Sequence, residues 1–159
     1  MKSVIAALVL LSGLTAHASF AELSGRIDCK GQFRPDILIR VTGNIDPVGP
    51  GSVLKRSVTG KLKVVLTVIG NGSSNILVTD EQKVSGTYLN HGPVNGGEVL
   101  TIVPAERGAY TKIIRSRFFE NGHGPRYTNT LQLHNPMAPE QGETVSLECG
   151  HGSGGASAR

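Results

Sequence analysis

The sequence predicts an all-β protein, an antiparallel β-sandwich of roughly eight to ten strands, with a small closed β-barrel as the alternative. Three observations lead to this fold class. Short stretches of alternating apolar and polar residues recur along the chain, separated by turns rich in glycine, asparagine or proline. No stretch shows a sustained helical periodicity behind a capping residue. The 159 residues are the length of one domain and can enclose a hydrophobic core.

The N-terminus has the features of a secretory signal peptide. Lys2 supplies a positive charge, Val4–Leu14 is an apolar run, and Ala16-His17-Ala18 is a cleavage site of the A-x-A kind. The apolar run has about 11 residues, fewer than the roughly 20 that a transmembrane helix needs. We therefore expect cleavage after Ala18, or as second choice after Ala21. The mature protein is then periplasmic or extracellular and has no transmembrane segment.

The first strand is expected at Leu23–Cys29 and the last at Val145–Cys149, and each places its cysteine on its apolar side. These are the only two cysteines. In an exported protein an even number of cysteines favours a bridge, so we expect a Cys29–Cys149 disulfide that joins the first strand to the last. These features divide the chain into a signal peptide, a single β domain and a flexible glycine- and serine-rich tail, over residues 1–18, 19–149 and 150–159.

After the first strand, alternation predicts a second strand at residues 37–42, and a short edge strand is expected at 53–58 beyond a loop that contains Pro47 and Pro50. Lys61–Ile69 is the clearest strand, because its apolar residues form an unbroken row on one face, as in a central strand that covers a core. A turn of glycine, asparagine and serine follows, and residues 76–78 return as the partner strand.

The second half of the domain continues with strands at residues 83–89, 99–103, 110–119 and 131–133. The strand at 110–119 is irregular, because Ile113-Ile114 and Phe118-Phe119 are adjacent apolar pairs. A period of two cannot bury both members of a pair on one face. We therefore expect a β-bulge in this strand or burial on both of its faces.

No constellation of residues in the sequence indicates catalysis. The mature chain has four histidines, but none is spaced from another as zinc ligands are. No serine lies in a G-x-S-x-G motif between a strand and a helix. We therefore expect no catalytic residues, no metal ligands and no cofactor. The histidines are His91, His123, His134 and His151.

Basic residues form the strongest candidate for a binding surface. Two of them two residues apart in a strand project from the same face, so neighbouring strands could present a cationic stripe to phosphate, sulfate or carboxylate groups. The alternative is that these side chains only keep the sheet soluble and its edges unpaired. Nucleic acid is not favoured as a partner, because few aromatic residues are available for base stacking. The candidate anion-binding residues are Arg115, Arg117, Lys112, Lys61 and Lys63.

Three functions remain as hypotheses. The first is an exported, non-enzymatic binding or envelope-associated protein whose partner is an anionic polymer or an envelope protein. The second is a small-ligand carrier with an apolar cavity in a closed barrel. The third is a small hydrolase in which His91, His123 or His134 converges with an acid or a serine in a cleft.

Overall fold

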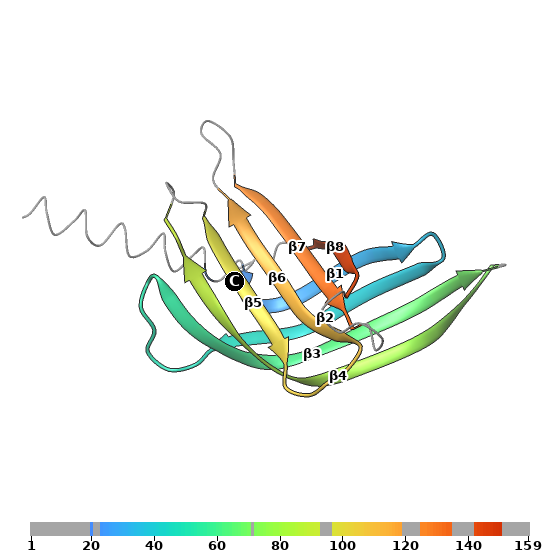
Figure 1. Cartoon of the computed structure of the whole chain (residues 1–159), viewed down its shortest axis with the longest axis horizontal. Coiled ribbons are helices and arrows are strands. Elements are labelled where there is room, and N and C mark those ends of the chain that lie inside the picture. Colours follow the sequence, from blue (N-terminus) through green and yellow to red (C-terminus); the bar gives the residue numbers. More distant parts are fainter. Residues whose placement is uncertain are drawn as a thin grey trace, which may run out of the picture.

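The computed structural model describes residue 20 and residues 23–70, 72–92, 97–118, 125–134 and 142–150. In these ranges eight antiparallel strands form one sheet in which each strand pairs with the next and the last pairs with the first (Figure 1). The all-β prediction is confirmed. The sandwich prediction is wrong, because the sheet closes into the barrel that was the alternative. The strands are β1 (Gly25–Arg34), β2 (Ile37–Pro47), β3 (Lys55–Gly70), β4 (Ser73–Asn90), β5 (Glu98–Pro104), β6 (Tyr110–Phe118), β7 (Arg126–Leu133) and β8 (Thr144–Cys149).

Two strands each join two segments that the sequence analysis expected to be separate. The segments expected at 53–58 and 61–69 are one 16-residue strand, β3, and those at 76–78 and 83–89 are one 18-residue strand, β4. Gly60 falls between the two expected segments, but it lies inside β3. A Cβ at Gly60 would lie 2.1 Å from the carbonyl oxygen of Asn44. A glycine within a strand thus lets β2 approach β3 closely, which permits the sharp curvature of a closing sheet.

The hydrophobic core lies inside the barrel and is built from alternate residues of every strand. In β6, Ile113 is buried while Ile114 is only half-buried, so this apolar pair is divided between the two faces. A register shift between Tyr110 and Lys112 precedes this pair, so burial on both faces, the alternative to a bulge, accommodates Ile113 and Ile114. Phe119 of the second pair lies outside the described residues. Fully buried core residues include Ile27, Ile39, Val41, Leu62, Val64, Leu100, Ile102 and Leu131.

The barrel closes where β1 meets β8, and the predicted Cys29–Cys149 disulfide is present at this seam. The seam is short, because β8 pairs with β1 only at Cys29, Lys30 and Gly31. The disulfide therefore joins two directly opposed residues of the ladder that completes the barrel.

The strands differ in length, and the barrel therefore has two different ends. β5 pairs with β4 only from Val84 to Asn90, whereas β3 and β4 continue to the turn after Gly70. The far ends of β1–β4 therefore project beyond β5–β8, on the right of Figure 1. We call this part of the sheet the β1–β4 extension. At the opposite end, Phe20 and Leu23 precede β1 and are buried.

The predicted signal peptide and residues 151–159 of the predicted tail lie outside the described residues. Within the described ranges, no helix combines the length and the hydrophobicity that a membrane crossing requires.

Candidate functional site

The structure does not bring the five candidate anion-binding residues together. Arg115 and Arg117 lie on the inner face of β6, where Arg115 is only 3 % exposed. Lys112 is half-buried on the same strand, and Lys61 and Lys63 lie at exposed positions of β3. Two strands, β4 and β5, separate β3 from β6 in the sheet. A single anion-binding surface made by all five residues therefore stays a prediction, and their positions in the structure do not support it.

Arg115 instead connects the barrel to the residues that precede β1. Its Nη1 donates a hydrogen bond of 2.6 Å to the carbonyl oxygen of Leu23, and its Nε donates one of 3.1 Å to Oδ1 of Asn129. Burial lowers the pKa of Arg115 to about 10. A guanidinium can be buried where its N–H groups meet buried acceptors. Here the hydrogen bond to Leu23 holds the residues just before β1 against the wall of the barrel.

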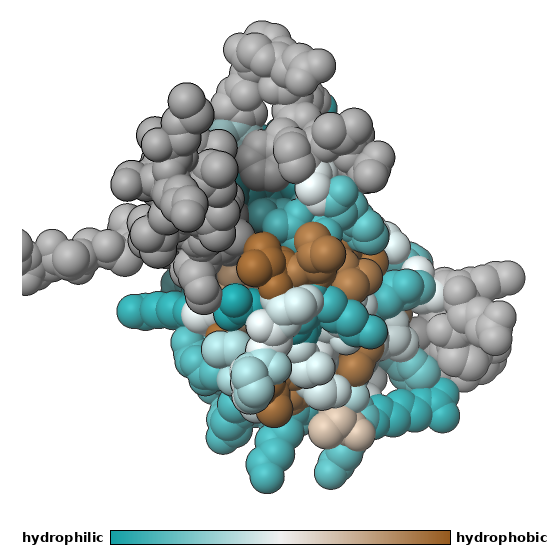
Figure 2. Space-filling model, turned by 90° about the vertical axis from the view of Figure 1, so that its left-hand side faces the viewer, coloured by the Kyte–Doolittle hydropathy of each residue, from teal (hydrophilic) through white to brown (hydrophobic). Residues whose placement is uncertain are grey.

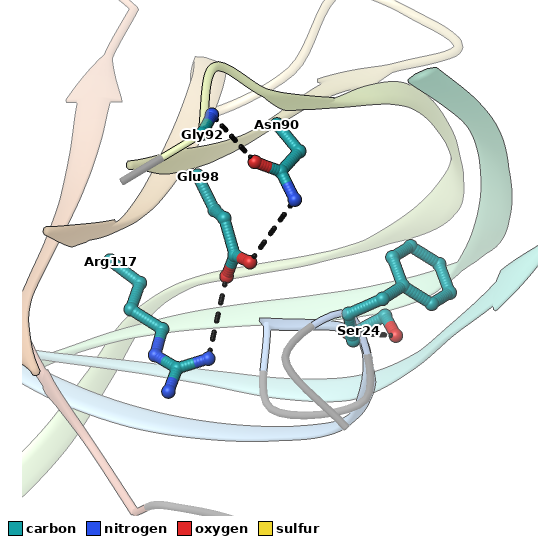
Figure 3. A network of polar contacts seen from close by, with 6 residues as sticks. Ser24, Asn90, Gly92, Glu98 and Arg117 are labelled. Atoms are coloured by element: carbon teal, nitrogen blue, oxygen red, sulfur yellow. Dashed lines mark hydrogen bonds and ion pairs between the residues drawn. The ribbon is translucent and has the colours of Figure 1, made fainter. Parts of the chain in front are cut away.

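A second buried contact lies beside it, between Glu98 of β5 and Arg117 of β6 (Figure 3). Oε2 of Glu98 lies 3.6 Å from Nη1 of Arg117, and the Glu98 side chain is 3 % exposed. Nδ2 of Asn90 donates to Oε1 of Glu98 at 3.5 Å, and Oδ1 of Asn90 accepts from the backbone of Gly92 at 2.8 Å. Burial, and secondarily the Glu98 carboxylate, raise the pKa of Tyr88 above its usual value.

Phe20 packs against Tyr88, which lies next to this polar cluster. Its ring meets the ring of Tyr88 edge-on with centroids 5.0 Å apart, and the Arg56 guanidinium lies 5.2 Å from its centroid. The hydroxyl and the backbone N–H of Ser24 both donate to the Phe20 carbonyl oxygen. Figure 2 views the molecule from this side and shows hydrophobic patches among hydrophilic ones. We call this end of the barrel, around Phe20, Tyr88, Glu98 and Arg117, the closed end. Its buried charged side chains bind other groups of the protein.

The sequence reasoning did not identify Glu98, Asn90 or Asn129. One signal was available for the arginines, because Arg115 and Arg117 are in phase with the core residue Ile113 in β6. That parity predicts burial rather than a solvent-facing charge.

The opposite end carries an open groove of about 620 Å³ on the outside of the sheet. Its apolar contacts include Leu38 of β2 and Ile69 of β3, which are 40 % and 44 % exposed. A second hollow of about 410 Å³ adjoins it, since both are lined by Lys30 and Glu148. We call the two together the outer groove. Its charged residues are Asp28, Lys30, Arg40 and Glu148.

One ion pair fixes part of this charged border. Arg40 binds Asp28 through two hydrogen bonds, Nε to Oδ1 at 3.2 Å and Nη2 to Oδ2 at 3.0 Å. This bidentate contact with Arg40 lowers the pKa of Asp28. Both side chains are exposed, so the pair sets the positions of two charges at the groove more than it stabilises the fold.

The described histidines do not form the arrangement expected of a hydrolase. His91 is exposed, and Nε2 of His134 accepts a hydrogen bond of 2.9 Å from Nε of Arg107. His123 and His151 lie outside the described residues. Within the part of the chain that the structure describes, no three histidine, cysteine or acidic side chains are grouped as metal ligands.

Comparisons with models of protein families, with curated proteins and with solved structures found no match to this chain.

Proposed function

We propose that the chain is an exported, non-enzymatic binding protein that docks a protein partner in its outer groove. The observation that carries the proposal is the composition of this groove, where exposed apolar side chains lie beside charges of both signs on a projecting part of the sheet. An apolar centre with a charged, solvent-exposed border is the usual anatomy of a protein–protein interface.

A protein partner accounts for the groove better than an anionic polymer does. A polyanion requires an excess of cations on one surface, but Lys30 and Arg40 stand beside Asp28 and Glu148. Elsewhere, Lys61 is paired with Glu81. Arg115 and Arg117 are engaged at the closed end.

A carrier that holds its ligand inside the barrel has less support. Buried apolar side chains from all eight strands form the described core, to which Phe20 and Leu23 also belong. The Cys29–Cys149 disulfide supports the exported location, because such bridges persist in oxidising compartments.

A binding assay with matched variants tests the proposal. The purified mature protein is immobilised and incubated with an envelope and secreted-protein extract of its source, and separately with heparin as a model polyanion. We expect a saturable protein partner that a double Leu38→Lys, Ile69→Lys variant no longer retains. The control Val103→Lys should retain it, because Val103 is 40 % exposed on β5 and does not line the groove. Retention of heparin alone, or equal retention of the partner by all variants, would refute the docking site.

A further inference from the structure

β4 has a free edge beyond the end of β5. Among the residues that the structure describes, β4 pairs with β5 only from Val84 onward. The β5–β6 turn then contacts β4 through Lys83, Gln82 and Asp80. From Ser73 to Thr79, β4 pairs with β3 on one side, and no described strand pairs with the other (Figure 1). A row of backbone N–H and C=O groups on such an edge can pair with another strand.

The side chains of this edge favour such pairing. Every residue from 73 to 79 is exposed, and Ile76, Leu77 and Val78 are 68 %, 55 % and 38 % exposed. The segment has no proline and no lysine, the residues that commonly blunt an edge strand. One feature of the segment works against edge pairing: the ladder with β3 has a bulge in which Leu77 is the extra residue between Ile76 and Val78. A closed barrel normally removes free edges, so the length of β4 restores one here.

The segment is complementary to a second copy of itself. In an antiparallel pair centred on Leu77, Leu77 opposes Leu77 and Ile76 opposes Val78. The same register places Asp80 opposite Ser74 and Glu81 opposite Ser73, so no like charges face each other. If the twofold pair were centred on Val78 instead, Ile76 would lie opposite Asp80. The apolar match and the charge match therefore select the same twofold register.

We infer that two copies of this chain form a symmetric dimer by antiparallel pairing of their β4 edges, centred on Leu77. Such an isologous interface is the commonest form of self-association, since one self-complementary patch is sufficient. Added backbone hydrogen bonds supply the attraction, and the apolar side chains fix the register. The groove proposal concerns an adjoining surface, because Ser74 lines the outer groove, whereas Leu77 at the centre of the pair does not.

Sedimentation velocity of the oxidised mature protein over roughly 1–200 µM tests self-association. Leu77→Lys should weaken the dimer at least tenfold, because the two introduced ammonium groups would lie directly opposite each other. Leu54→Lys is the matched control and should leave the dimer unchanged, since Leu54 is 64 % exposed in the connection between β2 and β3. A monomer throughout this range, or equal dimerisation of both variants, would overturn the inference.

Cysteine cross-linking tests the register. Both native cysteines are already joined, so an introduced cysteine has no free native partner. Directly opposed residues have Cα atoms about 4.5–5.5 Å apart, within disulfide range, and residues offset by two positions are about 7–8 Å apart. Leu77→Cys should therefore form a covalent dimer on mild oxidation. Ile76→Cys alone should not, but it should cross-link when mixed with Val78→Cys. Equal cross-linking of the two single variants at 76 and 77 would exclude this register.

Discussion

Reducing the Cys29–Cys149 disulfide should destabilise the barrel by several kcal/mol, because this bond secures the short seam at which the sheet closes. β1 and β8 share three residue pairs, and one of them is the disulfide itself. Without the bond, β8 remains attached to the sheet through a ladder with β7 of only three pairs, Thr130 to Gln132. The last strand therefore depends on the covalent link more than any other strand does.

The expected magnitude follows from the length of chain that the bond closes. The two cysteines are 120 positions apart in the sequence. In the chain-entropy model a loop of this length restricts the unfolded chain by about 5 kcal/mol, and native disulfides typically contribute about 2–5 kcal/mol. Such an amount is a large fraction of the total stability of an average domain, roughly 5–15 kcal/mol.

Urea unfolding followed by circular dichroism measures this difference. The same preparation is studied oxidised and after reduction with a phosphine, so that no side chain is altered. A Cys29→Ala, Cys149→Ala double variant serves as a second reduced state and should agree with it. Hydrogen exchange should show that the amides of β8 lose protection first. A difference in unfolding free energy below about 1 kcal/mol would show that the ladder closes the barrel without help.

Three further predictions concern the interior. Arg115→Met should lower the unfolding free energy by about 2–4 kcal/mol, because it leaves buried acceptors without their donor, and urea unfolding measures this. Burial raises the pKa of Tyr110 to about 12, above its unfolded value of about 10. The folded state therefore favours the neutral phenol: this contribution is fully present below about pH 10 and is lost as pH rises through about 12. Tyr110→Phe should flatten the fall in urea midpoint over that interval, and an unchanged slope would contradict the assignment. Gly60→Ala should cost about 2 kcal/mol or more, whereas Gly70→Ala, which meets no atom within 4 Å, should change stability by less than about 0.5 kcal/mol in thermal unfolding.

The alternation of apolar residues was sufficient to predict that the protein is all-β and that its two cysteines meet. Cys29 and Cys149 are at apolar positions of the outermost strands, and the predicted signal peptide favoured their pairing in a disulfide. Alternation indicates which face of a strand is buried, but it does not indicate whether two buried faces belong to one sheet or to two. The choice between sandwich and barrel was therefore open to error. Gly60 shows the reason, because its role inside β3 depends on the approach of Asn44 from another strand.

The candidate site was harder to predict than the fold. Arg115 and Arg117 were assigned to a solvent-facing surface because arginine is usually exposed. Glu98 and Asn129 lie directly opposite Arg117 and Arg115 on the neighbouring strands. Leu23, by contrast, is 92 positions from Arg115 in the sequence and meets it only in the folded barrel. The outer groove likewise brings together residues of β1, β2, β3, β4 and β8, which are far apart in the sequence. Its apolar residues Leu38 and Ile69 carry no distinctive motif.

The asymmetry of strand length explains why the two ends of this barrel differ in structure. At the closed end the strands finish near one another, so buried polar groups must find partners inside the protein, as Arg115 does at Leu23. At the other end β3 and β4 continue past β5, and the closed sheet becomes an open one with two faces and an edge. A face or an edge that the fold leaves uncovered is available to another molecule. Shortening the β3–β4 hairpin would therefore remove the proposed dimer edge, while the closed end, which holds the N-terminal segment, would stay intact.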